Sequence, residues 1–539
     1  MLIFDTQQRL TQTNRNGVNM KKGAKIGIAV GVAALAVAGG TFGAIAGGVF
    51  EKAPEYDFTV DYDGIAVAET IKDVAVHDPS IIKEDGTYYI FGSHMAAASS
   101  TDLTNWTLIG NGYSGKNKVF TDLKNYDSGE FDYAGNKASL NPTDDGEPHV
   151  WAPDVIYNEA QGLYYMYYCT SSNWNTSDIV YATSENVDGP YEWKGTLIYS
   201  GFTVNTIEAT NVLDYVDEET AIDEYTQKAG YEYNYEEYPN AIDPTVFYDA
   251  DGKMWMVYGS WSGGIFLLEI DESTGEVIHP EADPDNNVDP YFGKRLLGGG
   301  HTSIEAPYIL YDEDAGYYYL YVAYGELTRD GGYQIRVFRS ETVDGDYVDM
   351  NGARPDIGDA NAFYGLKLSG NYYLPSLEMG YKATGHCSAM IDDDGKRYIC
   401  YHTRFDMQSE THTPRVKQYF INEEGWPCML PYATNGETIS DTGYEEENLV
   451  GRYYVVNQGT GIDSEVAEPF ILYLNEDGSI VGENIDGSWN VADNSCYVHI
   501  TYDDKEYSGV FCQMQDEAGT DVMTFTAVGS NESIWGVKY

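Results

Sequence analysis

Basic residues are scarce in this chain of 539 residues. Lys and Arg together number 31, against 86 Asp and Glu, which gives a formal net charge of −55. A protein this acidic is repelled by a phosphate backbone, so we expect no nucleic-acid partner. The first 50 residues are the exception, because they hold five basic residues and one acidic residue.

Cysteine is also rare, with six residues in the whole chain and no CxxC pair. A zinc site or a thioredoxin-type redox site therefore has no support. Two pairs, Cys387 with Cys400 and Cys496 with Cys512, flank short acidic turns at similar distances. In hairpins each pair would lie across two strands and could form a disulfide. Buried free cysteines are the alternative, which is at least as well supported.

Charged residues are absent from 26–50, an apolar run that directly follows Lys21, Lys22 and Lys25. A basic flank before an apolar run is typical of a segment that exports the chain behind it. The run is long enough to span a bilayer but rich in glycine, so a cleaved signal and a retained membrane anchor both remain open. We expect residues 1–50 to be a cytoplasmic N-terminus with this segment, residues 51–69 to be a linker, and the rest to be extracellular or at the cell surface.

Tyrosine and glycine are abundant, with 49 and 57 residues, and this combination favours strands and turns over helices. Five segments share one pattern, in which a β-branched or aromatic run, an acidic turn with or near glycine and a second such run follow one another. They begin at Asp78, Ala152, Asp243, Ala306 and His386. Each segment therefore predicts a β-hairpin.

The spacing of these hairpins leaves room for two more strands after each, for example in residues 178–193 and 334–349. Five sheets of about four strands arranged radially form a five-bladed β-propeller. A two-sheet sandwich is the rival, which the long repeat interval disfavours. We therefore predict an all-β protein with the propeller over residues 70–440.

Two stretches interrupt the repeat, and the end of the chain departs from it. Residues 204–240 and 353–382 are predicted as long loop excursions. Residues 447–539 contain shorter alternating runs with polar turns, which predict a separate small C-terminal β-barrel or sandwich. A packing or binding role is expected for this last region.

Candidate catalytic residues occupy equivalent positions in the hairpins. Asp78, Asp243 and His386 each begin a hairpin, and Trp151 and Glu305 each precede one. Because inner strands line the channel of a propeller, these side chains should converge. Carboxylates that converge raise one another's pKa, which packing alone does not favour. Glycosidic bond cleavage needs one protonated and one ionised carboxyl group, so the set suggests a glycoside hydrolase.

Several ordered motifs also resemble those of one known family. The motifs are HDPSII at 77–82, HVWAPDVIY at 149–157, AIDPTVFYD at 241–249, YGSWSGGIFLLEID at 258–271 and SIEAPYILY at 303–311. They resemble glycoside hydrolase family 43, and within it the extracellular endo-α-1,5-L-arabinanases. The resemblance covers about residues 70–440, and the region after it looks like a β-barrel appended to some of these enzymes.

The resemblance implies a five-bladed propeller that hydrolyses arabinan, a polysaccharide side chain of pectin, with inversion of configuration. It implies that Asp78 is the general base, Glu305 the general acid and Asp243 the residue that modulates the pKa of the acid. An inverting enzyme places base and acid roughly 6.5–9.5 Å apart to admit a water molecule.

The resemblance also implies residues that bind rather than react. His386 matches a channel histidine that helps to hold a hydrated calcium ion. Since calcium prefers oxygen ligands, water molecules would have to complete its shell. Trp151 matches an aromatic residue that stacks on an arabinose unit, and Ser260 and Trp261 lie at a position that borders the cleft.

Two other functions remain open at this stage. An exo-acting α-L-arabinofuranosidase or β-xylosidase of the same family would use the same three acids, with loops that close one end of the cleft. A non-catalytic carbohydrate-binding propeller is the second alternative, but it has no need for a general acid.

Overall fold

The computed structural model describes residues 55–120, 129–359 and 361–539, so the apolar segment 26–50 lies outside the described residues. Within those ranges no helix is long and apolar enough to cross a membrane. Residues Tyr56–Tyr539 form one compact unit.

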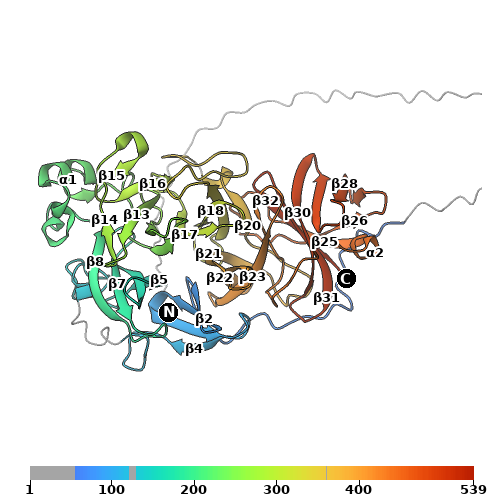
Figure 1. Ribbon diagram of the computed structural model, residues 1–539, viewed down its shortest axis with the longest axis horizontal. Helices are drawn as coiled ribbons and strands as arrows, with labels where there is room; N and C mark the ends of the chain where they lie inside the picture. Colours follow the sequence, from blue (N-terminus) through green and yellow to red (C-terminus); the bar gives the residue numbers. More distant parts are fainter. Residues whose placement is uncertain (1–54, 121–128, 360) are drawn as a thin grey trace, which may run out of the picture. The chain divides into compact units, whose positions relative to one another are not determined.

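Five antiparallel sheets make up the larger part of this unit (Figure 1). Blade 1 contains β1 (Ser80–Glu84), β2 (Thr87–Gly92), β3 (Ala96–Ser100) and β4 (Thr107–Gly110). Blade 2 contains β5 (Val150–Asn158), β6 (Leu163–Ser171), β7 (Ser177–Ser184) and β8 (Glu192–Tyr199). Blade 3 contains β11 (Thr245–Tyr248), β12 (Met254–Tyr258), β13 (Ile265–Asp271), β14 (Glu276–Ile278), β15 (Val288–Asp289) and β16 (Gly293–Leu297).

The last two blades have four strands each. Blade 4 contains β17 (Ile304–Asp312), β18 (Tyr317–Tyr324), β19 (Gln334–Ser340) and β20 (Leu366–Ser369). Blade 5 contains β21 (Tyr381–Ile391), β22 (Arg397–Phe405), β23 (Thr413–Ile421) and β24 (Pro427–Met429). The first strands contact one another in the cyclic order β1, β5, β11, β17, β21 and back to β1, which closes the ring. The predicted propeller is therefore confirmed, and the sandwich is excluded.

The two long excursions differ from the prediction in one respect. Residues 204–240 hold short elements, namely η4 (Ile207–Ala209), η5 (Val212–Asp214), α1 (Glu218–Tyr225), β9 (Thr226–Gln227) and β10 (Glu232–Tyr233). Residues 353–382, expected as a loop, supply β20, so the proposal that blade 4 is completed within 334–349 is wrong. Asp349 explains why this strand comes late in the chain. Its carboxylate accepts hydrogen bonds from the backbone N–H groups of Ala353 and Gly365, so the chain turns away from blade 4 before it returns as β20.

The inner strands share an unusual backbone conformation at the position that begins each repeat. Asp78, Ala152, Asp243, Ala306 and His386 all have positive φ angles, between 42° and 55°. The strand register shifts at the same place in β5, β17 and β21, which marks a β-bulge. Non-glycine residues adopt this conformation at a cost, and bulges re-aim side chains beside active sites. The repeat thus carries its strain where the candidate site residues lie.

The C-terminal region is a closed eight-stranded barrel. Its strands are β25 (Gly451–Asn457), β26 (Phe470–Leu474), β27 (Ser479–Gly482), β28 (Ile485–Val491), β29 (Tyr497–Tyr502), β30 (Lys505–Gln515), β31 (Asp521–Gly529) and β32 (Glu532–Lys538), preceded by the short helix α2 (Glu446–Leu449). Of the two predicted forms, barrel and sandwich, the barrel is the one present. Part of the predicted linker packs on it, since Tyr473 contacts Tyr56 and Phe58.

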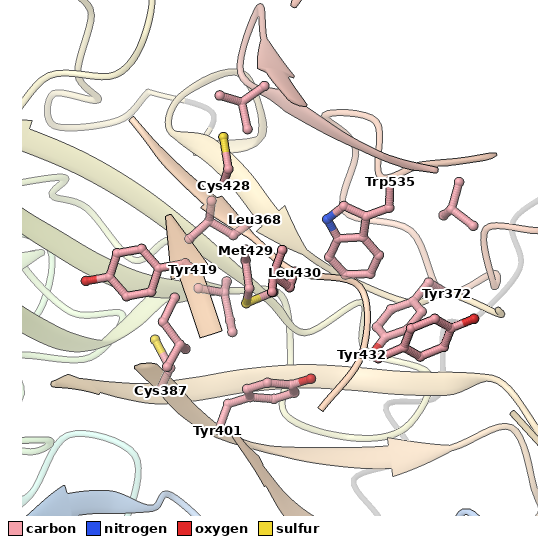
Figure 2. Close-up of a cluster of buried hydrophobic side chains, with 14 of the residues drawn as sticks. Leu368, Tyr372, Cys387, Tyr401, Tyr419, Cys428, Met429, Leu430, Tyr432 and Trp535 are labelled. Atoms are coloured by element: carbon pink, nitrogen blue, oxygen red, sulfur yellow. The ribbon is translucent and has the colours of Figure 1, made fainter. Parts of the chain in front are cut away.

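One apolar core joins the barrel to the propeller (Figure 2). Trp535 of β32 lies edge-on against Tyr372, with ring centroids 4.9 Å apart. The ammonium group of Lys417 lies 4.5 Å from the Tyr372 ring and 4.2 Å from the Trp535 ring, and it donates a hydrogen bond to the carbonyl of Pro431. Cation–π contacts compensate in part for burying this charge.

All six cysteines are free and buried, so neither possible disulfide is present. In blade 5 the residue opposite Cys400 is Ser388, and its neighbour Cys387 therefore points to the other face of the sheet. In the barrel Phe511 donates its N–H to the carbonyl of Cys496, so Cys512 is offset by one residue. Symmetric spacing about a turn thus does not place either pair face to face.

Candidate active site

Asp78 lies at the start of blade 1 among imidazoles and is only 6% exposed. One carboxylate oxygen, Oδ1, lies 3.0 Å from Nδ1 of His386. The other, Oδ2, lies 2.6 Å from Nδ1 of His77 and accepts a hydrogen bond from the hydroxyl of Ser93. Burial alone would raise the pKa of Asp78, but the charge of His386 and the hydrogen bonds of His386 and His77 outweigh it. The pKa of Asp78 is held well below 3.8, so the group stays ionised.

Arg404 fixes the imidazoles behind this carboxylate. Its guanidinium lies 3.1 Å from Nε2 of His402 and 3.3 Å from Nε2 of His77, whose rings stack with centroids 4.1 Å apart. A guanidinium only donates hydrogen bonds, so Nε2 of His77 is the acceptor and Nδ1 carries the proton that faces Asp78. Glu410 in turn accepts a hydrogen bond from Nε of Arg404 at 2.7 Å.

Glu305 lies in β17 and is 9% exposed, but its partners are neutral. Its Oε2 accepts hydrogen bonds from Nε1 of Trp261 at 2.8 Å and from the hydroxyl of Ser260 at 3.1 Å. The hydroxyl of Tyr333 lies 2.6 Å from Oε1. Burial raises the pKa of Glu305 above its usual value, and these hydrogen bonds only partly oppose that shift. The group is therefore suited to carry a proton.

Asp243 and His386 complete the centre. Asp243 accepts a hydrogen bond at 3.1 Å from the backbone N–H of Ala306, the residue that follows Glu305. Burial and the charges of Glu305 and Asp78 raise the pKa of Asp243 to about 7, although His386 opposes them. Burial lowers the pKa of His386, but the carboxylate of Asp78 outweighs it, and this pKa is about 9.

The structure thus groups the residues predicted from the sequence in two sets. Asp78 and His386 contact directly, whereas Glu305 contacts the two residues expected to border the cleft, Ser260 and Trp261. Trp151 is half-buried and packs on His94, with ring centroids 4.5 Å apart. One carboxyl group held ionised and another held protonable is the combination that acid–base chemistry on one bond requires.

Several site residues were not predicted from the sequence. They are His77, Ser93, Tyr333, His402 and Arg404. His77 begins the motif HDPSII, His402 lies in the fifth hairpin, and Arg404 directly follows that hairpin. Two histidines 16 residues apart in one hairpin could have indicated that both face the channel. Tyr333 stands in a loop before β19 and carries no comparable signal.

One imidazole nitrogen of the centre is placed to hold a metal ion. Nδ1 of His386 faces Asp78, so Nε2 is the nitrogen of this ring that could bind a metal ion. Calcium prefers oxygen ligands, so one imidazole beside three carboxylates fits a calcium ion that keeps several water molecules in its shell. Metal-ligating atoms of His77, Asp78 and His402 lie within 4.8 Å of one another. This second group does not fit a metal, because Arg404 leaves Nδ1 of His77 protonated.

Comparisons with known proteins agree with this geometry. The model of a family described as glycosyl hydrolases family 43 matches residues 68–220 and 219–427. A second model, described as a C-terminal lipocalin-like domain, matches residues 431–536. Together these matches cover the propeller and the barrel.

Individual relatives are similar along most of the chain. Extracellular endo-alpha-(1->5)-L-arabinanase 2 of Bacillus subtilis is 36% identical over 499 residues, which cover 89% of this chain and 96% of that protein. The extracellular endo-alpha-(1->5)-L-arabinanase of Thermotoga petrophila is 36% identical over 485 residues, which cover 87% and 94%. The crystal structure of the endo-1,5-alpha-L-arabinanase from Thermotoga petrophila RKU-1 superposes with a TM-score of 0.74 at 34% identity and covers 87% of this chain and 99% of its own.

Proposed function

The chain belongs to glycosyl hydrolases family 43, and we propose that it hydrolyses internal α-1,5-L-arabinofuranosyl linkages of arabinan with inversion of configuration. Two extracellular relatives named as endo-arabinanases match more than nine-tenths of their own length at 36% identity. The observation that carries the proposal is the opposite environment of two equally buried carboxyl groups, Asp78 and Glu305. A protein that only binds carbohydrate has no use for that difference.

In this mechanism Asp78 is the general base. It accepts a proton from the water that attacks the anomeric carbon, and its low pKa keeps it ionised before the reaction. His77 and His386 orient its two oxygens by hydrogen bonds. The negative charge is thus placed before the substrate arrives, so little reorganisation is needed during the reaction.

Glu305 is the general acid in this mechanism. Neutral donors, the indole of Trp261 and the hydroxyls of Ser260 and Tyr333, surround the carboxyl group of Glu305. Its acidic proton passes to the oxygen of the departing sugar as the bond breaks. An ionised Asp243 repels a negative charge on Glu305, so it favours the protonated form of the acid.

Calcium belongs to the proposal as a resident ion. His386 would hold it through Nε2, which would give up its proton to the solvent when the ion binds, with water molecules as the remaining ligands. When bound, the ion supplies fixed positive charge beside the carboxylates, the same contribution that a protonated His386 makes to Asp78. Metal analysis of the purified protein by mass spectrometry, with activity measured before and after chelation, tests this assignment.

Export is also part of the proposal. Relatives that match most of the chain are named extracellular, and residues 26–50 are a suitable export segment behind a basic flank. Sequencing the N-terminus of protein recovered from the membrane and from the medium distinguishes a retained anchor from a cleaved signal.

Product analysis on linear α-1,5-arabinan tests the proposed function. We expect short arabino-oligosaccharides as early products, with the β-anomer formed first in proton NMR spectra, and no products from Glu305→Gln. Arabinose as the single early product would assign the enzyme to the exo-acting class. No release from arabinan or from arabinosyl and xylosyl aryl glycosides would contradict hydrolysis and favour a carbohydrate-binding protein.

A further inference from the structure

His94 lies beside the proposed base in a conformation that costs free energy. It follows Ser93, whose hydroxyl donates to Asp78, and it has a φ of 60°. Met95, the next residue, has a φ of 59°. Two successive non-glycine residues in the left-handed region are strained, and such strain persists only where the surrounding structure imposes it.

Hydrogen bonds on both sides of His94 and Met95 impose this left-handed conformation. The hydroxyl of Ser93 accepts the N–H of Ala152, the start of blade 2, at 3.0 Å. The carbonyl of His94 accepts the N–H of Gly112, and the carbonyl of Met95 accepts the side-chain amide of Asn117. Glycine at either position would make these bonds without strain, so the hydrogen bonds do not explain why histidine is present.

The side chain of His94 offers a reason. Met95 is fully buried, whereas His94 is exposed and packs on Trp151. The hydroxyl of Tyr113 accepts the N–H of Val150 at 3.0 Å and lies 3.4 Å from Nδ1 of His94. Nε2 is therefore the nitrogen of this exposed ring that is placed to bond a ligand.

The acid side of the centre shows the same kind of constraint. Trp261, whose indole donates to Glu305, also has a positive φ, 57°. Its strained backbone places a side chain that acts in the centre. His94 is the corresponding residue on the side of blades 1 and 2, and its ring contacts both Trp151 and Tyr113.

We propose that His94 is a sugar-binding residue that, with Trp151, forms a subsite for a neutral pentofuranose unit on the base side of the cleft. Trp151 provides an apolar face for the sugar ring, and Nε2 of His94 forms a hydrogen bond with one of its hydroxyl groups. The inference rests on the proposed function, since it concerns a sugar of arabinan. The backbone strain at His94 is then retained because it places this nitrogen.

Substitution by glycine separates binding from stability. In His94→Gly we expect KM for linear arabino-oligosaccharides to rise about five- to twentyfold with kcat within twofold, while the melting temperature is unchanged or higher. In the catalytically inactive Glu305→Gln background, adding His94→Gly should weaken binding of the same oligosaccharides by a similar factor in calorimetry. His94→Asn, which tolerates positive φ and keeps a polar group, should have a KM and an affinity between those of the wild type and of His94→Gly.

Ala229→Gly is the matched control. Ala229 is an exposed non-glycine residue with a φ of 58° in the excursion 204–240, so its replacement relieves similar strain without touching the cleft. We expect its melting temperature to respond as in His94→Gly and its KM to stay unchanged. Unchanged KM and oligosaccharide affinity in both His94 variants would overturn the inference while leaving the proposed function intact. A wild-type protein inactive on arabinan would overturn the proposed function and this subsite with it.

Discussion

Asp78 and Glu305 are two carboxyl groups of one channel with nearly equal exposure, 6% and 9%, and opposite behaviour. Imidazoles surround Asp78 and hold its pKa far below the usual value. A phenol, a hydroxyl and an indole surround Glu305, and burial raises its pKa. The difference shows that burial does not decide the protonation of a carboxyl group here. The charge of its hydrogen-bond partners decides it.

Removing either carboxyl group should have the largest effect on this comparison. Asp78→Asn and Glu305→Gln are each expected to lower kcat on linear arabinan about 10²–10⁴-fold, because general acid and base contributions have that size. The measurement is initial-rate kinetics by reducing-end release. Asp154→Asn is the control, since Asp154 is also buried but binds Ser80 and the N–H of Val246 away from the reacting groups. A loss of less than tenfold in either catalytic variant would contradict its role.

Replacing His386, the cationic partner of Asp78, should raise the pKa of Asp78 and so make it more like that of Glu305. In His386→Gln the positive charge beside Asp78 is lost, so the pKa of Asp78 rises. Because the base must be ionised, the acidic limb of the pH profile of kcat/KM should move up by about one pH unit or more. His279→Gln, in blade 3, should leave the profile unchanged. An acidic limb that stays in place in His386→Gln would separate His386 from the base.

Replacing the guanidinium tests how the imidazoles are held. Arg404→Lys keeps a positive charge but lacks the rigid planar fork that holds two imidazoles in fixed orientations. We expect kcat to fall about tenfold with KM within twofold, since His77 becomes free to turn its unprotonated nitrogen toward Asp78. Arg397→Lys is the control, because Arg397 pairs with Asp312 outside the centre. Equal kcat values for wild type and Arg404→Lys would contradict a positioning role.

The smallest change is expected on the acid side. Tyr333→Phe removes a hydrogen bond that lowers the pKa of Glu305, so this pKa rises further. Glu305 then stays protonated to higher pH, and the alkaline limb of kcat/KM should move up by a few tenths of a pH unit, with kcat reduced about two- to fivefold. Tyr191→Phe, which removes a buried hydroxyl in blade 2, should move neither limb. A shift of the limb to lower pH would contradict this sign.

Much of the fold and the three carboxylates could be predicted from the sequence because both follow from one repeat. Each hairpin pattern is local, and Asp78, Asp243 and Glu305 occupy or adjoin its first position. Two residues that hold the centre, Tyr333 and Arg404, could not be predicted in this way. Tyr333 comes from a loop before β19, and Arg404 from the end of β22, so their contacts depend on how separate blades meet.

The missed strand of blade 4 has a similar cause. The sequence after β19 resembles a strand in composition, but Asp349 binds the distant Gly365 and the side chain of Asn531 in the barrel. Hydrogen bonds to residues so far along the chain leave no local pattern. The possible disulfides failed for a related reason, since a one-residue offset in register places two cysteines on opposite faces of a sheet.

The assignment of opposite roles to Asp78 and Glu305 is tested most directly by the dependence of rate on the leaving group. The measurement is kcat/KM for 4-nitrophenyl and unsubstituted phenyl glycosides of α-1,5-L-arabinobiose, with wild type, Asp78→Asn and Glu305→Gln. A 4-nitrophenolate departs with little help from an acid, so Glu305→Gln should regain much of its activity on that substrate, whereas Asp78→Asn should remain equally impaired on both. The same loss on both substrates in Glu305→Gln, or recovery in Asp78→Asn, would contradict the account.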